Sequence, residues 1–245
     1  MTAVRVFPDP QALAEAAARR VVEQAQAAID ARGLASLALS GGSTPRDLHL
    51  KLASPPLVDQ LDWSKVHVFF GDERCVPPDD ERSNYRMAEE TLLSRVPIPR
   101  HQIHRMGGEL PPPEAADDYE RQLREFFGQD PPRLDIILLG MGDNGHTASL
   151  FPGLQAVHEQ QRWVVAEYVA EVGMWRVTLT PVVINLAREV IFLVAGAAKA
   201  DMLRQVLEGP YAPAQRPAQI VKPSPGEVVW LIDAAAADKL SRPAY

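Results

Sequence analysis

The sequence predicts an α/β fold, with a three-layer, mostly parallel, doubly wound (Rossmann-like) sheet and a small antiparallel addition. Apolar runs of strand length alternate with segments of helical periodicity along all 245 residues, a pattern typical of parallel sheets covered by helices. Several of these runs end directly in glycine or polar residues. Two alternating stretches, 163–167 and 176–180, flank a turn and predict the antiparallel addition. Because no repeat or linker divides the chain, we expect residues 1–245 to form a single domain.

The first half of the chain predicts alternating strands and helices. Residues 4–7 alternate like a short edge strand, and the apolar runs 34–39 and 66–70 have the length of buried strands. Apolar residues at helical spacing, with proline in the first turn or glycine at the end, predict the helices 10–32 (closed by Gly33), 45–52, 84–95 and 113–127.

The second half continues the pattern around one long loop. The strand 134–139 leads into residues 140–153, which become compatible with a helix after Thr147. Two further apolar runs, 190–195 and 228–232, predict buried strands. The expected helices of this half are 181–187, 197–208 and 233–240, the last with Asp233 as its N-cap.

Composition excludes several classes of function. A formal net charge of −7 argues against broad nucleic-acid binding, so an anionic ligand must be held by a few placed cations. The single cysteine, Cys75, excludes an intrachain disulfide and fits a reducing compartment. No apolar run approaches the ~20 residues of a membrane span, and no Cys/His cluster has metal-ligand spacing. We expect a cytoplasmic protein that binds no membrane, metal or cofactor.

The loop 140–153 surrounds one histidine, His146, with four glycines. A histidine in a loop is usually structural. Glycines at the end of a strand let backbone N–H groups approach a ligand closely, however, and a structural histidine does not need so open a backbone. We therefore take His146 as the candidate reactive group.

Two other strand ends carry candidate ligand groups. Strand 34–39 runs into Ser40-Gly-Gly-Ser-Thr-Pro45, which suits either a phosphate-binding loop at a helix N-terminus or a tight turn with a Ser/Thr cap. Strand 66–70 runs into Asp72, Glu73 and Arg74, which suit either a solvated loop or a polar site. We interpret Cys75, beside Arg74, as a packing residue rather than a nucleophile, because no catalytic partner lies nearby in the sequence.

Two further cations are candidates. Lys199 falls in the first turn of a predicted helix, where a positive charge opposes the helix dipole, so a bound anion favours this placement over a solvent-facing lysine. Arg176 lies at the N-terminal rather than the carboxyl end of its predicted strand, so its assignment to the site has the weakest support among these residues. Since parallel strands deliver their carboxyl ends to one edge of a sheet, these groups should converge there.

The converging groups suit hydrolysis or proton transfer on a phosphorylated small molecule. A neutral histidine can take a proton from water near physiological pH, and arginine and lysine can hold a phosphate. The sequence has no G-x-S-x-G, H-E-x-x-H, P-loop or dinucleotide-binding motif, so covalent, metal and redox chemistry lack support.

Together the motifs resemble the 6-phosphogluconolactonase family. The match is carried by Ser40-Gly-Gly-Ser-Thr-Pro45, Gly71-Asp-Glu-Arg-Cys-Val-Pro77 with Ser83-Asn84, Gly145-His-Thr-Ala-Ser-Leu-Phe-Pro-Gly153, Arg176-Val-Thr-Leu-Thr-Pro181 and Phe192-Leu-Val-Ala-Gly-Ala-Ala-Lys-Ala200. The resemblance implies a carboxylic ester hydrolase that converts 6-phospho-D-glucono-1,5-lactone to 6-phosphogluconate in the oxidative pentose phosphate pathway, without a cofactor. We expect a monomer or weak homodimer.

The resemblance also assigns roles to residues. It implies His146 as the general base that activates water, with Asn144 and Asp72 completing the catalytic set and Asp72 orienting Arg74 or a substrate hydroxyl. The implied substrate-binding residues are Gly41, Gly42, Ser43, Thr44, Arg74, Arg176 and Lys199. Family members often have aspartate where this chain has Asn144, so either the carboxylate is dispensable or Asp143 replaces it.

Two alternatives remain open. A glucosamine 6-phosphate isomerase and deaminase shares the implied fold, but it needs a carboxylate base, and no acid follows His146 in the expected segment. A sugar-phosphate sensor without catalysis would keep the cations and lose the base, which this chain retains.

Overall fold

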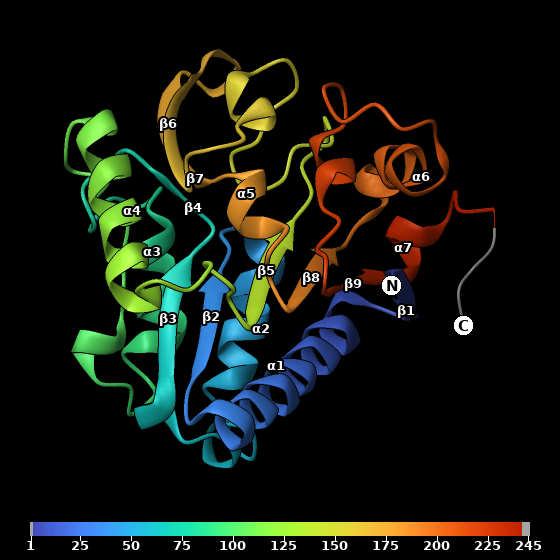
Figure 1. Ribbon diagram of the computed structural model, residues 1–245. Coiled ribbons are helices and arrows are strands. Elements are labelled where there is room, and N and C mark those ends of the chain that lie inside the picture. Colours follow the sequence, from blue (N-terminus) through green and yellow to red (C-terminus); the bar gives the residue numbers. More distant parts are fainter. Residues whose placement is uncertain (1, 242–245) are drawn as a thin grey trace.

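A computed structural model describes residues 2–241 as two sheets with helices around them (Figure 1). The larger sheet has six strands in the order β1-β9-β8-β5-β2-β3, and every neighbouring pair is parallel. Its strands are β1 (Thr2–Phe7), β2 (Ala35–Leu39), β3 (Val66–Phe70), β5 (Ile136–Gly140), β8 (Glu189–Val194) and β9 (Glu227–Asp233). The smaller sheet is antiparallel, in the order β4-β7-β6: β4 (Asp72–Arg74), β6 (Val164–Val169) and β7 (Met174–Leu179).

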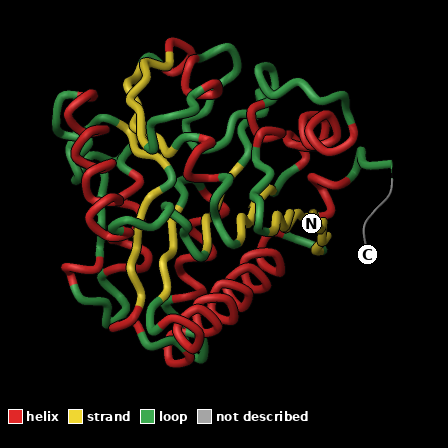
Figure 2. Tube along the Cα trace, viewed as in Figure 1, coloured by secondary structure: helices red, strands yellow, loops and turns green. Residues whose placement is uncertain are grey.

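Helices connect the parallel strands, as an all-parallel sheet requires (Figure 2). The α-helices are α1 (Pro10–Arg32), α2 (Ser43–Leu52), α3 (Asn84–Ala88), α4 (Pro112–Phe127), α5 (Pro181–Ile184), α6 (Ala200–Glu208) and α7 (Ala234–Ala237). The short helices relevant to the site are η3 (Glu89–Leu93), a π-helix, and the 3₁₀-helices η5 (Gln155–His158), η6 (Ala170–Val172) and η7 (Ala197–Lys199).

Strand β3 shows that the fold has three layers. Successive side chains of a strand point to opposite faces of the sheet. Phe69 contacts Phe126 of α4, with ring centroids 5.0 Å apart, whereas its neighbour Phe70 contacts Tyr85 of α3 at 6.0 Å. Helices α4 and α3 therefore cover opposite faces, and α1 and α2 pack against each other on the face of α3. The predicted three-layer α/β fold with an antiparallel addition is confirmed.

The core lies between these layers and explains why the parallel strands are apolar throughout. Every residue of β2 and of β8 is buried. Helix α1 presents a face of small side chains to the sheet, including Ala17, Ala18 and Ala25, all fully buried or nearly so. Small residues let the helix approach the sheet closely, and the burial of apolar area contributes about 25 cal/mol per Å².

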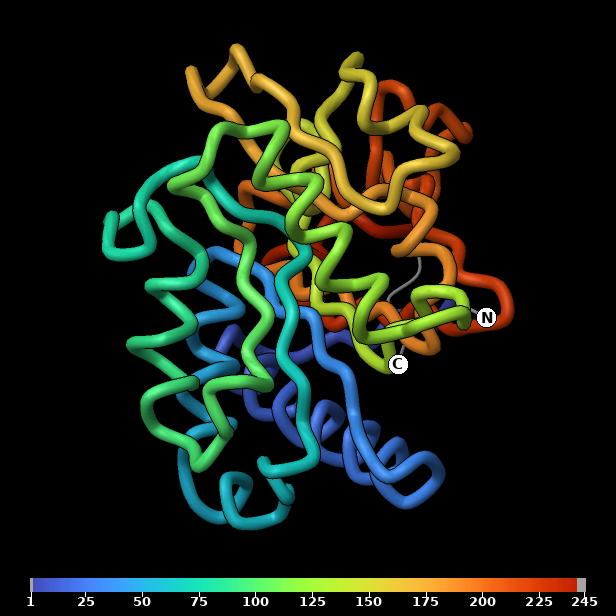
Figure 3. Tube along the Cα trace, turned by 60° about the vertical axis from the view of Figure 1, so that its left-hand side comes forward, coloured from blue at the N-terminus to red at the C-terminus, as the bar shows by residue number. Residues whose placement is uncertain are grey.

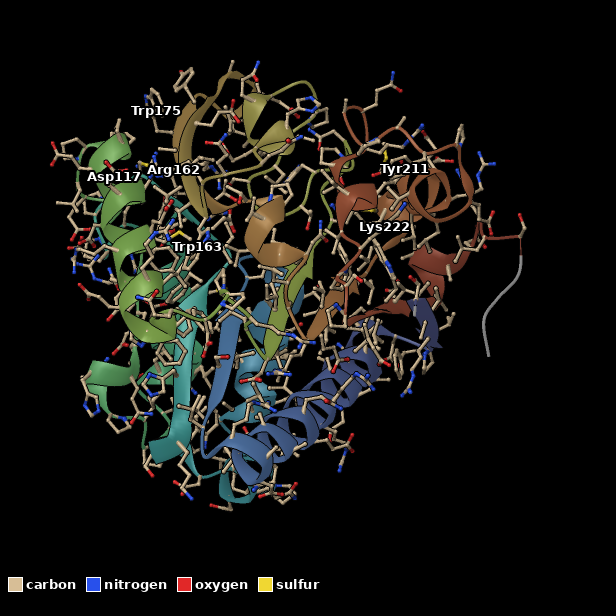
Figure 4. All side chains as sticks on the ribbon, viewed as in Figure 1. Asp117, Arg162, Trp163, Trp175, Tyr211 and Lys222 are labelled. Carbon is tan, nitrogen blue, oxygen red and sulfur yellow. The ribbon has the colours of Figure 1, made fainter. Side chains whose placement is uncertain are left out.

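The antiparallel sheet is attached to α4 by Arg162, which precedes β6. Its Nη2 lies 2.6 Å from Asp117 and its Nε 2.8 Å from Glu120, both on α4, and Arg124 of α4 stacks over Trp163 at 4.1 Å (Figure 4). These contacts place the β6–β7 hairpin at the end of the molecule opposite α1 (Figure 3). The hairpin therefore lies above the carboxyl ends of the parallel strands.

Several predicted elements match the structure in position. The boundaries of α1 and β3 are those predicted, Gly33 is the left-handed C-cap of α1 (φ 83°), and the Asp233 side chain caps α7 through the N–H of Ala236. The other predicted strands lie within one or two residues of the prediction, but β4 was not predicted, because its residues were expected to form a loop or a polar site.

Other predictions were wrong. No helix follows Thr147: residues 147–153 form turns, because the Thr147 hydroxyl donates to the Gly140 carbonyl (2.8 Å) and the buried Ser149 hydroxyl to Asp72 (2.7 Å). The helix expected over 84–95 continues as the π-helix η3 after Ala88, and the one expected over 197–208 begins as the 3₁₀-helix η7. The helices expected over 181–187 and 233–240 are shorter than predicted, since α5 ends at Ile184 and α7 at Ala237.

Within residues 2–241, no helix combines the length and the apolar character needed to cross a membrane.

Candidate active site

A cavity of about 250 Å³ opens at the carboxyl ends of four adjacent strands, β8, β5, β2 and β3. The chain passes from β2 to β3 on one side and returns through β5 and β8 on the other, so the strand order reverses between β2 and β5. Such switch points are where open α/β sheets bind ligands. The cavity is lined by Ser40, Gly41, Gly42, Asp72, Arg74, Asn84, Gly140, Met141, Gly142, His146, Ala148, Arg176 and Lys199.

The structure thus brings together most of the residues predicted from the sequence. Three of them do not line the cavity. Asn144 contacts His146 instead, and Ser43 and Thr44 form the first turn of α2 next to Gly42.

His146 is held in one orientation by its surroundings. Its ring stacks on Phe151, with centroids 4.0 Å apart, and packs on Gly142, where an added Cβ would lie 2.0 Å from the ring Cε1. The Asn144 Oδ1 lies 2.7 Å from Nδ1 and accepts the His146 backbone N–H at 3.1 Å. Gly142 is therefore glycine because the imidazole occupies the space of a side chain.

The environment of His146 keeps the imidazole neutral. Burial lowers its pKa to about 4; the charge of Asp72 opposes this shift, whereas Arg176 and Lys199 add to it. At neutral pH the side chain is unprotonated at one nitrogen and can accept a proton.

Asp72 lies at the centre of a buried polar network. Its Oδ2 accepts the Ser149 hydroxyl at 2.7 Å, and the Asn84 amide contacts its carbonyl (2.9 Å) and its Oδ1 (3.3 Å). Arg176 Nη1 lies 3.8 Å from Oδ2. Among residues 2–241, Asp72 forms an ion pair with Arg176 and none with Arg74. That Asp72 orients Arg74 or a substrate hydroxyl stays a prediction.

Arg74 and Arg176 form a pair of like charges. They are opposite each other in the β4–β7 ladder, and the Nε atoms of both are buried without a hydrogen-bond partner among residues 2–241. The pKa of Arg176 is lowered by burial, and the charge of Arg74 adds to this effect. Like charges directly opposite in a sheet are destabilising, so this arrangement favours an anion between or beside them.

Lys199, the last residue of η7 after β8, also lines the cavity. Its Nζ contacts Asp143 at 2.5 Å, and this hydrogen bond lowers the pKa of the Asp143 carboxyl. Asp143 is 78% exposed, so the pair is solvated and can exchange for a ligand oxygen at little cost. Asp143 therefore pairs with Lys199, while Asn144 is the residue that contacts His146.

The loop after β2 has the geometry of an anion-binding turn. Gly42 is the N-cap of α2 with φ 108° and provides no side-chain cap. A Cβ on Gly41 would lie 2.0 Å from the Asn84 Oδ1, so both glycines are required by their positions. The N–H groups in the first turn of a helix have no intrahelical partner and are available to a ligand.

Three residues at the site had little signal in the sequence: Asn84, Ser149 and Ala148. Asn84 is part of the Ser83-Asn84 motif that opens a predicted helix, yet its amide lies in the cavity. Ser149 supports Asp72 from 77 positions away, a contact that only the fold creates. Ala148 has φ 47°, a strained value for a residue other than glycine, and lines the cavity.

Cys75 is a packing residue, as interpreted from the sequence: burial raises the pKa of its thiol to about 11. Among residues 2–241, no three His, Cys, Asp or Glu side chains are grouped as a metal site requires.

Comparison with known families agrees with this geometry. The family described as glucosamine-6-phosphate isomerases/6-phosphogluconolactonase matches residues 8–230. The chain belongs to this family. The resemblance inferred from the sequence motifs is thus confirmed.

Relatives within the glucosamine-6-phosphate isomerase/6-phosphogluconolactonase family align over nearly the full chain. A 6-phosphogluconolactonase of Nostoc sp. is 41% identical over 242 residues, covering 97% of this chain and 98% of the relative, and one of Synechocystis sp. is 42% identical over 241 residues with the same coverage. The structure of 6-phosphogluconolactonase from Trypanosoma brucei superposes with a TM-score of 0.87 at 32% identity, covering 98% of this chain and 99% of that one.

Proposed function

We propose that this protein hydrolyses 6-phospho-D-glucono-1,5-lactone to 6-phospho-D-gluconate. The observation that carries the proposal is the presence, in one cavity, of a neutral imidazole and the opposed arginines Arg74 and Arg176. The imidazole suits general-base hydrolysis, and the two arginines suit a phosphate. The names of the Nostoc, Synechocystis and Trypanosoma relatives support the same substrate.

In the proposed mechanism, His146 takes a proton from water as the oxygen attacks the lactone carbonyl carbon. The tetrahedral oxyanion is stabilised by the available N–H groups beside Gly41 and Gly42. Its collapse breaks the bond between this carbon and the ring oxygen, and the imidazolium returns the proton to that oxygen. The product carboxylic acid then ionises, and the histidine is neutral again.

The phosphate is proposed to lie on the cationic side of the cavity. Arg74 and Arg176 present guanidinium groups that can donate paired hydrogen bonds to phosphate oxygens, and Lys199 adds a third charge. Phosphate binding would relieve the repulsion between the two arginines. The binding energy of the phosphate group, which lies away from the reacting carbon, would then hold the lactone carbonyl near His146.

Isomerisation or deamination of an amino-sugar phosphate is the competing proposal. It requires a carboxylate that moves a proton between adjacent carbons. Among the described residues, Asp72 is the only carboxylate that lines the cavity, and Ser149, Asn84 and Arg176 already engage it. The geometry therefore favours hydrolysis.

A direct assay tests the proposal. Purified protein should accelerate the disappearance of 6-phosphogluconolactone at fixed pH beyond spontaneous hydrolysis, and it should leave glucosamine 6-phosphate unchanged. Ammonia release from glucosamine 6-phosphate, or lactone decay at the uncatalysed rate, would reject it.

A further inference from the structure

The side chain of Asn144 contacts two groups at once. Its Oδ1 faces the His146 Nδ1 at 2.7 Å and accepts the His146 backbone N–H, while its Nδ2 donates to the Glu171 Oε2 at 2.8 Å. A backbone N–H can only donate and a carboxylate oxygen can only accept. These two contacts therefore identify the nitrogen and the oxygen of the Asn144 amide independently, and they give the same orientation of the side chain.

This orientation determines the tautomer of His146. An amide oxygen carries no hydrogen, so the 2.7 Å contact is a hydrogen bond only when Nδ1 bears the proton. A neutral imidazole has a single N–H, which leaves Nε2 with the free electron pair. Nε2 is then the nitrogen that can accept a proton from water.

We propose that Glu171 is a positioning residue for His146 and acts through the side-chain amide of Asn144. The hydrogen bond to the Glu171 carboxylate polarises the Asn144 amide, and this polarisation makes Oδ1 a better acceptor for the Nδ1–H of His146. It also supplies, one side chain further away, the negative charge that an aspartate at position 144 would provide directly. The inference rests on the proposed role of His146 as the base.

The position of Glu171 comes from the β6–β7 hairpin. The last paired residues of the two strands are Val169 and Met174, and the connecting turn is η6 followed by Gly173 with φ 60°. This short turn brings Glu171, from outside the parallel sheet, back over the loop that carries His146. Glu171 is exposed, so its replacement removes the contact without opening the core.

Other charges also act on the imidazole and must be kept constant in any comparison. Asp72 acts in the same direction as Glu171, favouring the protonated ring, while Arg176 and Lys199 oppose it. All three line the cavity, whereas Glu171 lies outside it. Changing Glu171 therefore alters the support of His146 without removing a group that can contact substrate.

The first experiment reads the tautomer by long-range ¹H–¹⁵N NMR of the free protein. The wild-type His146 should be mainly the Nδ1–H form. Glu171→Ala should shift the population towards Nε2–H, whereas Glu171→Gln, whose carbonyl can still accept from Asn144, should keep it. An unchanged tautomer ratio in Glu171→Ala would overturn the proposal.

The second experiment is kinetic. Glu171→Ala should lower kcat for lactone hydrolysis by roughly three- to tenfold with little change in KM, and Glu171→Gln should lower it less. The control is Glu23→Gln, which removes one exposed charge on α1 and should leave kcat at the wild-type value. A rise in KM at constant kcat would contradict a positioning role.

A double substitution separates positioning from general structural support. With Asn144→Asp, the carboxylate contacts His146 directly and offers no hydrogen to Glu171, so the two acids repel. Adding Glu171→Ala to Asn144→Asp should then leave kcat unchanged or raise it. The same loss as in the wild-type background would refute the relay.

The proposed function and this inference can fail separately. If wild-type protein does not hydrolyse the lactone, the proposed function is wrong. The tautomer shift is measured without substrate, so it still tests whether Glu171 acts on His146 through Asn144.

Discussion

Arg74 on β4 and Arg176 on β7 are direct cross-strand neighbours, with both Nε atoms buried. Opposed like charges cost stability in a sheet, and little water screens Arg176, whose side chain is 12% exposed. Arg74 is half-buried and also donates to the Arg82 carbonyl. Asp72 offers only partial compensation, since its Oδ2 lies 3.8 Å from Arg176. We interpret the pair as a site that is incomplete until a dianion binds.

Replacing one of these arginines should therefore weaken binding of the phosphate group more than binding of the sugar ring. Arg176→Ala or Arg74→Ala should raise KM for the phosphorylated lactone by at least about tenfold, with a much smaller effect on unphosphorylated gluconolactone. Equal effects on both substrates would refute the phosphate assignment.

The same variants should also change the response to inorganic phosphate. Phosphate should raise the Tm of the wild type, because it binds only the folded state, and should raise that of the arginine variants much less. Arg19→Ala, which removes an exposed arginine of α1, provides the control and should respond like the wild type. A wild-type Tm insensitive to phosphate would count against the site.

His146→Ala should abolish lactone hydrolysis while leaving binding of 6-phosphogluconate largely intact. The reason is that His146 is proposed to move a proton, whereas the cations hold the phosphate. We expect kcat to fall by about 10²- to 10⁴-fold, the usual contribution of a general base. Kinetics and calorimetric titration with the product measure the two effects, and a near-normal kcat would exclude His146 as the base.

The pH dependence should follow the lowered pKa of His146. Because burial lowers that pKa to about 4, the ring stays unprotonated at pH values where a solvent-exposed histidine, with a pKa near 6.5, would already be protonated. With unphosphorylated gluconolactone, kcat/KM should be nearly constant from about pH 8 to pH 6 and fall only below about pH 5. NMR titration of the imidazole should give the same midpoint. A midpoint near 6.5 would contradict the buried neutral state.

The sequence was most informative where local chemistry determines structure. Apolar periodicity and the Gly33 cap were sufficient to locate α1. The glycines at 41 and 142 were expected to admit a ligand, and the contacts that the structure shows at these positions are with the Asn84 and His146 side chains. The convergence of Asp72, Arg74, His146 and Lys199 followed from a general rule about parallel strands.

What the sequence could not give were contacts between distant segments. The Ser149 hydroxyl and the Asp72 carboxylate meet only after the antiparallel sheet is assembled, and their contact replaces the helix that the local pattern after Thr147 favours. Glu171 lies 27 positions from Asn144 in a turn with no motif of its own. The choice between Asn144 and Asp143 likewise depended on which side chain the fold turns towards His146 and which towards Lys199.

A pair of glycine substitutions can test whether ring placement, rather than overall stability, controls activity. Gly142→Ala would put a Cβ 2.0 Å from the His146 Cε1, so the imidazole must move, and a displacement of about 1 Å can cost about 10²-fold in rate. Gly33→Ala meets no atom within 4 Å but forces alanine into a left-handed conformation, which costs about 1 kcal/mol. We expect the first variant to lose kcat and the second to lose Tm while keeping kcat. If kcat followed Tm across both variants, the position of His146 would not be what limits catalysis.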